Sequence, residues 1–251
     1  DVVMALSNDH ILPELVHNPR EIEMPASLEE DYRKLETEMY LELAEGKIAA
    51  ANGGVLISKC LQYPSGAVYQ ADDAGNPTTE WEEIHTLKMD ALADLVDDLQ
   101  GKSIMVAVQF KHEVARILAQ YPDAVHATSA NIADVEARWN RGEIKMLVAH
   151  PLSCGHGLNL QFGGGDICFF SLPYSLEQFE QSIGRLRRPG QKKQAVTVHS
   201  LLVSGTVDLA AWRARQNKQS IQDALKFAMR AVTARAQASS YALEAAWRAS
   251  P

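Results

Sequence analysis

Short apolar runs alternate with amphipathic stretches through the middle of the chain, and this alternation constrains the fold more than any other feature. The apolar runs predict strands at residues 104–110, 124–128, 145–150, 166–172 and 195–202. Helical signals precede or separate them at residues 87–99, 111–121, 131–142 and 175–188. Strands as apolar as these are buried on both faces, which is typical of a parallel sheet with helices on each side. We therefore predict a doubly wound α/β domain over residues 86–205.

The segments on either side of this domain carry weaker patterns. Residues 25–47 show helix signals, with Ser27 as the N-cap and Glu30 three residues later. Most turn formers fall within residues 52–80, which predicts an irregular segment or a short hairpin there. After Thr206 the pattern is helical. The predicted parts are therefore an irregular and helical linker (1–85), the α/β domain (86–205) and a helical extension (206–251).

Composition excludes several classes of protein. With 251 residues, 46% of them hydrophobic, the chain can bury a sizeable core. No run approaches the roughly 18–20 apolar residues of a membrane span, and the first residues show no secretory signal. The formal net charge of −8 argues against a protein that coats nucleic acid over its whole surface, but it allows a local basic track. The first residue is Asp rather than Met, so we expect a piece of a longer protein.

The cysteines and histidines do not predict a metal site. Cys60, Cys154 and Cys168 have no CxxC spacing, and we expect them to be small buried side chains in a reducing compartment. The eight histidines show no spacing typical of metal ligands.

Gly101-Lys102-Ser103 resembles the end of a phosphate-binding loop, but its context is wrong for one. Val96 stands where the motif requires its first glycine, and the triplet ends a predicted helix instead of opening one. We interpret Gly101 as a glycine at a helix C-terminus, with Lys102 favouring the helix dipole. No acidic magnesium motif follows, so the sequence lacks the parts that hold the phosphates and metal of a nucleotide.

The stretch QSIGRLRRPGQ, which begins at Gln181, places three arginines within four positions of an acidic chain. On a helix, Gln181, Arg185 and Arg188 lie on one stripe. Gly184 lies beside that stripe and leaves room for another surface to approach. Guanidinium groups are permanently charged forks that suit phosphate oxygens, so the stripe indicates an arginine-finger site for phosphoryl transfer. The alternative is a basic, solvent-facing helix end. Ser175 forms a predicted capping box at the start of this helix.

A second polar stretch, SCGHGLNLQ, directly follows the predicted strand KMLVAH. The carboxyl ends of strands are where α/β sheets bind ligands. Gly155 and Gly157 allow a phosphate or an adjoining domain to approach the backbone closely. Ser153, Asn159 and Gln161 supply neutral hydrogen-bonding groups. Two spaced glycines also suit an ordinary strand-to-helix turn.

Together the two stretches resemble the second RecA-like lobe of superfamily-two helicases, specifically the Swi/Snf-type DNA translocases. SCGHGLNLQ is similar to motif V of that family, and QSIGRLRRPGQ is similar to motif VI, including its final Gly-Gln. IMVAVQF resembles motif IV, and LPYSLEQFEQ resembles the link from motif V to motif VI. The resemblance extends over roughly residues 10–230, and motif VI is its most specific part. It implies a three-layer RecA-like parallel sheet with helices on both faces.

The resemblance also implies how the work is divided among residues. ATP with Mg²⁺ would be held mainly by a first lobe that precedes Asp1. The catalytic residues would be Arg185 and Arg188, which reach across as fingers, and Gln181, which orients them. The residues nearest the nucleotide would be Gly155, Gly157, Asn159 and Gly184. The residues that contact the DNA backbone would be Gln109, Phe110, Lys111, Ser153 and Gln178.

The expected function is one half of an ATP-dependent double-stranded-DNA translocase, which would hydrolyse ATP poorly or not at all by itself. Cycles of cleft closure and opening would step the whole protein along a duplex. One alternative is a lobe of a strand-separating or branch-migrating helicase. Another is an adaptor that binds nucleic acid or a partner without ATP, in which lysines could replace the arginines with little effect.

The sequence departs from the family pattern at several points. His156 stands where a small or acidic residue is usual, and Tyr174-Ser175 replaces an expected tryptophan. The accessory insertions of eukaryotic remodellers have no room between residues 110 and 185. We therefore expect a compact bacterial or phage-encoded intracellular protein, with no membrane partner.

Overall fold

The computed structural model describes residues 12–44, 58–72, 77–152, 158–173 and 175–216. Two compact units make up the chain, and each is formed from two separate stretches of sequence. The first unit comprises Asp1–Ile22 and Thr86–Leu202. The second comprises Glu23–His85 and Val203–Pro251. The chain returns to the first unit at Thr86.

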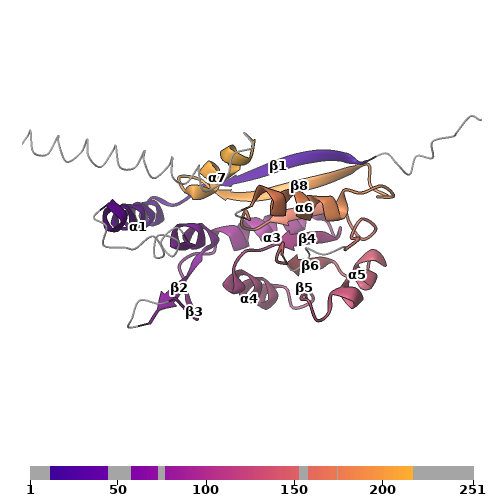
Figure 1. The fold of residues 1–251 in the computed structure, drawn as a ribbon, viewed down its shortest axis with the longest axis horizontal. Helices are drawn as coiled ribbons and strands as arrows, with labels where there is room; N and C mark the ends of the chain where they lie inside the picture. Colours follow the sequence, from indigo (N-terminus) through magenta and orange to yellow (C-terminus); the bar gives the residue numbers. More distant parts are fainter. Residues whose placement is uncertain (1–11, 45–57, 73–76, 153–157, 174, 217–251) are drawn as a thin grey trace, which may run out of the picture. The chain divides into compact units, whose positions relative to one another are not determined.

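A six-stranded sheet with the order β1-β8-β7-β4-β6-β5 forms the centre of the first unit (Figure 1). Its strands are β1 (Glu14–Ile22), β4 (Ile104–Ala107), β5 (Val125–Ala127), β6 (Met146–Ala149), β7 (Asp166–Phe169) and β8 (Ala195–Val203). The pairs β5–β6, β6–β4, β4–β7 and β7–β8 are all parallel. All five strands that the apolar runs predict are confirmed, most of them with shorter bounds.

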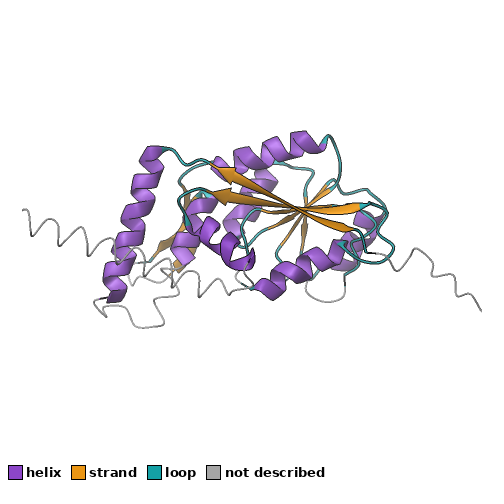
Figure 2. Ribbon diagram, turned by 90° about the horizontal axis from the view of Figure 1, so that it is seen from above, coloured by secondary structure: helices purple, strands orange, loops and turns teal. Residues whose placement is uncertain are grey.

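Helices cover both faces of this sheet (Figure 2). They are α3 (Leu87–Leu99), α4 (Lys111–Gln120), α5 (Ile132–Asn140) and α6 (Leu176–Leu186). The crossover from β4 through α4 to β5 moves toward one edge, whereas the crossover through α5 to β6 moves back. Because such connections are right-handed, α4 and α5 lie on opposite faces. The predicted three-layer α/β architecture is therefore confirmed.

Side-chain packing assigns the remaining helices to faces. Leu92 of α3 and Ile117 of α4 share a buried cluster with Val106 and Phe170, so α3 and α4 cover the same face. Successive residues of an extended segment point to opposite faces. The ring of Phe169 lies 4.4 Å from that of Phe179 on α6, measured between centroids. Helix α6 therefore packs on the face opposite to α3 and α4.

Strand β1 is an element that the sequence did not reveal. Its sequence ELVHNPREI is largely polar, and its side chains alternate between exposed and half-buried, as at the edge of a sheet. The Glu14 N–H donates to the Gln194 carbonyl at 2.9 Å, which sets the start of β1 beside the start of β8. The linker segment predicted for residues 1–85 thus contributes a strand to the sheet.

The ends of two helices test particular predictions. Helix α3 ends at Leu99, and Gln100 and Gly101 follow it with left-handed backbone angles. This confirms that the Gly-Lys-Ser triplet closes a helix. Helix α6 ends at Leu186 with Arg187 as its C-cap, so the predicted helix through Arg188 is wrong. Pro189 and Gly190 follow three and four residues after this end, a usual sign of helix termination.

The second unit contains helices and one hairpin. Its described elements include α1 (Ala26–Ala44), the 3₁₀ turn η2 (Tyr63–Ser65), β2 (Ala67–Ala71), β3 (Pro77–Glu83) and α7 (Val207–Gln216). Strands β2 and β3 are antiparallel, which confirms the predicted hairpin. Helix α1 begins at Ala26, so Ser27 lies in its first turn instead of preceding it. The buried Tyr32 hydroxyl accepts a hydrogen bond from the Val207 N–H at 3.1 Å and joins α1 to α7.

Neither a membrane span nor a metal cluster occurs among the described residues. No helix there is long and apolar enough to cross a bilayer. No three His, Cys, Asp or Glu side chains there form a group that could hold a metal. Cys60 and Cys168 are buried, as predicted, and burial raises the pKa of each thiol to about 12. Cys154 lies outside the described residues.

The close approach of Gly163 to Trp139 predicts a large stability effect. A Cβ at Gly163 would lie 2.3 Å from the Trp139 carbonyl oxygen, whereas a Cβ at Gly184 in α6 would meet nothing within 4 Å. We expect Gly163→Ala to lower the free energy of unfolding by about 1–3 kcal/mol. Gly184→Ala should raise it by about 0.5–1 kcal/mol, because alanine favours the helix. Denaturant titration measures both, and similar losses in the two variants would contradict this packing.

Candidate functional site

The two stretches that carry the family resemblance lie side by side in the first unit. The Leu160 N–H donates to the Arg185 carbonyl at 3.1 Å. The Gln191 side-chain amide donates to the carbonyls of Gly164 and Leu186 at 2.9 and 3.0 Å. Gln191 is the last residue of the arginine-rich stretch, and its bonding role was not predicted. These bonds fix residues 160–164 against the second half of α6.

Helix α5 holds the same segment from its other side. The Trp139 indole N–H donates to the Leu160 carbonyl at 2.8 Å. The Asn140 side-chain amide donates to the Asn159 carbonyl at 2.6 Å, and the Glu136 carboxylate accepts from the Asn159 N–H at 3.3 Å. Asn159 is therefore fixed through both of its backbone groups. The sequence analysis missed these α5 residues, whose only signal is their place on an amphipathic helix.

Arg188 connects two other residues that the sequence analysis selected, Asn159 and Gly184. Its guanidinium Nη1 donates to the Asn159 side-chain oxygen. Its Nε donates to the Gly184 carbonyl at 2.9 Å. That carbonyl lies in the last turn of α6, where backbone oxygens lack a partner within the helix. Arg188 thus reaches this position by folding back on the helix end and not, as the predicted stripe required, by lying on the helix itself.

The neighbouring arginines have different environments. Only 8% of the Arg185 surface is exposed, so this side chain is largely enclosed by the lobe. The Arg187 Nε donates to the Pro13 carbonyl at 2.9 Å, beside the start of β1. The Gln181 amide donates to the Glu177 carboxylate at 2.8 Å, one turn earlier on α6. Arg188 is half-buried, which leaves part of its guanidinium-bearing side chain accessible to a ligand.

Among the described residues, no atom would contact a Cβ at Gly184 within 4 Å. A glycine inside a helix costs about 1 kcal/mol relative to alanine, and a Cβ at this position would meet open space. Its carbonyl is also the acceptor for Arg188. A side chain at this position would therefore project into space that the described residues leave open.

The four predicted DNA-contact residues that the structure describes lie at one edge of the sheet. Gln109, Phe110 and Lys111 follow β4 after one intervening residue, and Gln178 lies in the first turn of α6, which follows β7. Strands β4 and β7 are parallel neighbours, so these residues share the carboxyl edge. The Ser175 hydroxyl accepts from the Gln178 N–H at 3.4 Å, which confirms that half of the capping box.

The predicted DNA-contact residue Gln178 and the Arg188 contact are separated along α6. Gln178 lies six residues before Gly184, whose carbonyl accepts from Arg188, and this corresponds to about 9 Å along the helix. Of the other predicted site residues, Ser153, Gly155 and Gly157 lie outside the described residues, as does His156.

Phe110 is held by a buried histidine. The rings of Phe110 and His112 stack with their centroids 5.4 Å apart and their planes 12° from parallel. His112 is fully buried. Burial, reinforced by the positive charge of Arg116, lowers the pKa of His112 to about 3. The imidazole is therefore neutral in the folded protein near pH 7.

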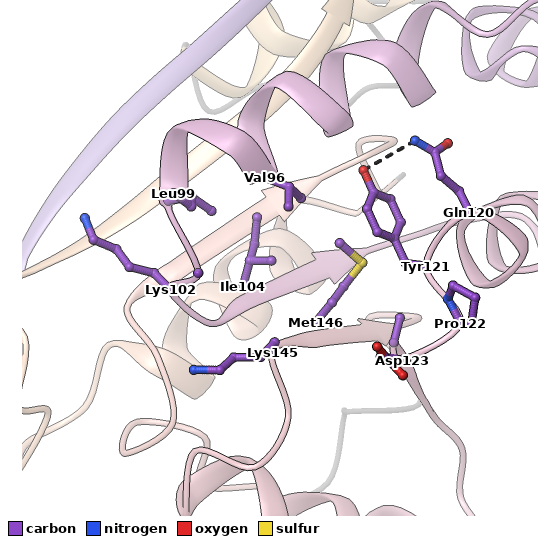
Figure 3. Close-up of a pocket in the computed structure, with 12 residues that line it drawn as sticks. Val96, Leu99, Lys102, Ile104, Gln120, Tyr121, Pro122, Asp123, Lys145 and Met146 are labelled. Carbon is purple, nitrogen blue, oxygen red and sulfur yellow. Dashed lines mark hydrogen bonds between the residues drawn. The ribbon is translucent and has the colours of Figure 1, made fainter.

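A pocket of about 240 Å³ lies at the opposite edge of the sheet (Figure 3). Its apolar lining includes Val96, Leu99, Ile104 and Met146, and Ile104 and Met146 are the first residues of β4 and β6. Tyr121 stands at one side of the pocket, and its hydroxyl accepts from the Gln120 amide at 3.4 Å. The pocket is thus separate from the carboxyl-edge residues.

Comparison with solved structures assigns the fold to a class. The C-terminal part of the Fun30 ATPase domain matches with a TM-score of 0.60 and 13% identity, over 81% of this chain and 89% of that one. The SWI2/SNF2 ATPase core of Sulfolobus solfataricus in complex with dsDNA matches with a TM-score of 0.57 and 13% identity. The match covers 80% of this chain and 43% of that one. The C-terminal domain of the SWI2/SNF2 ATPase of S. solfataricus matches with a TM-score of 0.53 and 14% identity. The match covers 82% of this chain and 86% of that one. The chain has the fold of a Swi2/Snf2-type C-terminal RecA-like lobe, as the sequence predicted.

A curated relative is more similar in sequence. Protein p41 of Acyrthosiphon pisum secondary endosymbiont phage 1 is 38% identical over 226 residues, which cover 87% of this chain and 47% of p41. The chain therefore spans about half the length of this relative. No protein-family model matches the chain.

The buried His112 predicts a pH dependence of stability. An unfolded histidine takes up a proton near pH 6.5, whereas folded His112 does so only near pH 3. The stability that the neutral ring contributes is present above pH 6.5 and is lost as the pH falls toward 3. Between pH 7 and pH 5 we expect this group to lower the free energy of unfolding by about 2 kcal/mol.

His112→Gln removes this titration and keeps hydrogen-bonding capacity. Denaturant unfolding of both proteins across pH 5–7 separates this contribution from that of the carboxylates, which titrate in both. The difference between the unfolding free energies of the two proteins should change by about 2 kcal/mol between pH 7 and pH 5. If the two free energies instead change in parallel with pH, His112 is not a neutral buried group.

Proposed function

We propose that this chain is the second lobe of an ATP-dependent double-stranded-DNA translocase of the Swi/Snf type. The single observation that carries the proposal is the contact of Arg188 with Asn159 and the Gly184 carbonyl. It joins a residue of the motif VI-like stretch to a residue of the motif V-like stretch, in a lobe with the Swi2/Snf2 fold. A guanidinium held in this way is a preorganised donor for phosphate oxygens.

ATP with Mg²⁺ would be held mainly by a first lobe of the same protein. The bound nucleotide supplies the phosphoryl group, and this chain supplies Arg188 to stabilise the charge that develops on it. Asn159 and the Gly184 carbonyl orient the Arg188 fork, and Gly184 leaves room for the approaching lobe. Arg185, which is more deeply buried, would act as the second arginine of the site, and Gln181 would help to orient the pair. The greater length of p41 is consistent with a second lobe.

Duplex DNA is the proposed polymer substrate. A structural neighbour is a SWI2/SNF2 ATPase core in complex with dsDNA. In this chain the carboxyl edge offers Lys111, the amides of Gln109 and Gln178, and the backbone of the loop after β4. Contacts of this kind go to phosphate oxygens, so the protein would bind duplexes with little sequence preference. The likeness to p41 favours a phage-encoded protein that works inside a bacterial cell.

Helix α6 connects the two proposed contacts. Gln178 lies at its start beside the DNA edge, and Arg188 folds onto its end. A helix transmits displacement over this length as one rigid element. Movement of the lobe against the nucleotide would therefore move the DNA edge with it, which is the requirement for stepping along a duplex.

An arginine substitution tests the nucleotide contact. In protein that contains the first lobe, we expect Arg188→Ala to reduce DNA-stimulated ATP hydrolysis on the order of 10³-fold and to leave ATP affinity within a few-fold. Arg188→Lys should not restore turnover, because an ammonium cannot reproduce the two-pronged contact. Arg187→Ala is the matched control, since Arg187 bonds to Pro13 instead. Turnover by Arg188→Ala within tenfold of the wild type would contradict the finger assignment.

The choice of DNA separates the translocase from its alternatives. We expect duplex DNA to stimulate hydrolysis more than single strands do, with displacement of a third strand from a triplex and no unwinding of a forked duplex. Steady-state ATPase and strand-displacement assays measure these outcomes. Unwinding of the fork would instead indicate the strand-separating helicase, and duplex binding without hydrolysis would indicate the adaptor.

A further inference from the structure

Glu113 is a buried carboxylate that the proposed nucleotide and DNA contacts leave without a role. It lies in the first turn of α4, and its side chain is fully buried. Its Oε2 accepts from the Gln109 N–H at 2.7 Å and from the Phe110 N–H at 3.2 Å. Phe110 is the N-cap of α4 but has no side-chain oxygen to satisfy the helix start. Glu113 therefore fixes the backbone of the loop that ends β4.

The same carboxylate reaches the neighbouring connection. Its Oε1 accepts from the Ser171 hydroxyl at 2.5 Å, and Ser171 lies between β7 and α6. The positive charge of Lys88, which is buried in the first turn of α3, also acts on Glu113. One carboxylate thus joins three segments at the carboxyl edge, namely the starts of α3 and α4 and the path into α6.

Stability alone is a weak reason for this arrangement. Burial raises the pKa of Glu113, while the hydrogen bonds from Ser171 and Gln109 and the charge of Lys88 act in the opposite direction. Buried ion pairs are often no more stable than well-packed apolar side chains of similar volume. An exposed Ser or Asp at the N-cap would satisfy the start of α4 at lower cost. The buried network does something that such a cap would not, because it fixes the loop relative to α6.

We propose that Glu113 is a positioning residue for DNA binding. It sets the Gln109–Lys111 loop at a fixed place relative to the first turn of α6, so that Lys111 and Gln178 meet successive parts of one DNA backbone. Lys88 compensates its charge, and Ser171 holds its side chain toward α6. This inference rests on the proposed function, because the loop needs a fixed position only if it contacts DNA.

The sign of a substitution effect distinguishes positioning from simple electrostatics. Removal of a carboxyl group near a polyanion should strengthen DNA binding or leave it unchanged on Coulombic grounds. A positioning role predicts the opposite. In the protein with both lobes, we expect Glu113→Ala to weaken binding to a 30-base-pair duplex about tenfold, measured by fluorescence anisotropy. Glu113→Gln keeps an acceptor at the same reach and should restore most of the affinity.

Asp166→Asn is the matched control for loss of a partly buried carboxylate. Asp166 lies at the amino end of β7 and bonds to His199 at 3.1 Å, away from the DNA edge. We expect it to change stability without changing DNA affinity. If Glu113→Ala fails to fold, Ser171→Ala provides a milder variant that keeps both backbone contacts of Glu113 and should weaken binding by a smaller factor.

A double-mutant cycle tests whether Glu113 acts through the loop. In a Lys111→Ala background, Glu113→Ala should weaken duplex binding by no more than about twofold, because the contact that it positions is already lost. Full additivity of the two effects would overturn the proposal. So would a Glu113→Ala protein that binds the duplex as tightly as the wild type.

Amide hydrogen exchange provides a readout that does not depend on DNA. The Gln109 and Phe110 amides should exchange at least about tenfold faster in Glu113→Ala than in the wild type, and at the wild-type rate in Asp166→Asn. Unchanged exchange would overturn the positioning role whatever the DNA result. If the wild type binds no duplex while the exchange result holds, the proposed function fails and Glu113 is left with a purely architectural role, which also overturns its assignment to DNA binding.

Discussion

The candidate site depends on the contact between residues 158–165 and the second half of α6. The Leu160 N–H donates to the Arg185 carbonyl. Arg188 donates to the Asn159 side chain, and Gln191 donates to the Gly164 carbonyl. On the other side, the Trp139 indole of α5 donates a hydrogen bond to this segment. Gly163 allows the segment to lie close to the indole, because a Cβ there would clash with Trp139. Without this layer the polar stretch after β6 and the arginine-rich stretch would be unrelated loops. With it, they form one surface on a lobe that has the Swi2/Snf2-type fold.

The chemistry follows from how differently the charged groups are held. Arg185 is enclosed, Arg187 is tied to the start of β1, and Arg188 is half-buried and oriented by Asn159 and the end of α6. Three arginines within four positions of the sequence therefore have three separate environments. Near the start of α6, the buried Glu113 carboxylate bonds to Gln109 and Ser171. This carboxylate, and not a surface cation, fixes the loop that we propose to contact DNA.

The sequence predicts the fold well because its signals are local and consistent. Apolar strands and amphipathic helices follow one another, and Gly101 marks a helix end that the structure confirms. Strand β1 was missed because an edge strand can be polar, and its pairing with β8 is a long-range contact. The extra length predicted for α6 is a different kind of error, since Pro189 and Gly190 already indicated an end before Arg188.

The site is less predictable than the fold. Residue types selected Arg188, Asn159 and Gly184, but not the bonds that bring them together across 29 and 4 positions of sequence. Glu113 had a local signal, a glutamate at the third position of a helix, although nothing in the sequence indicated its bond to Ser171.

The central claim is that a guanidinium of this chain acts on a nucleotide held by another lobe. It is tested most directly by a structure of the two-lobed protein with duplex DNA, Mg²⁺ and a phosphoryl-transfer transition-state analogue. The account predicts that Arg188 Nη atoms lie about 3 Å from the analogue's equatorial oxygens or fluorides. An Arg188 side chain that stays on Asn159 and faces away from the bound nucleotide would contradict it.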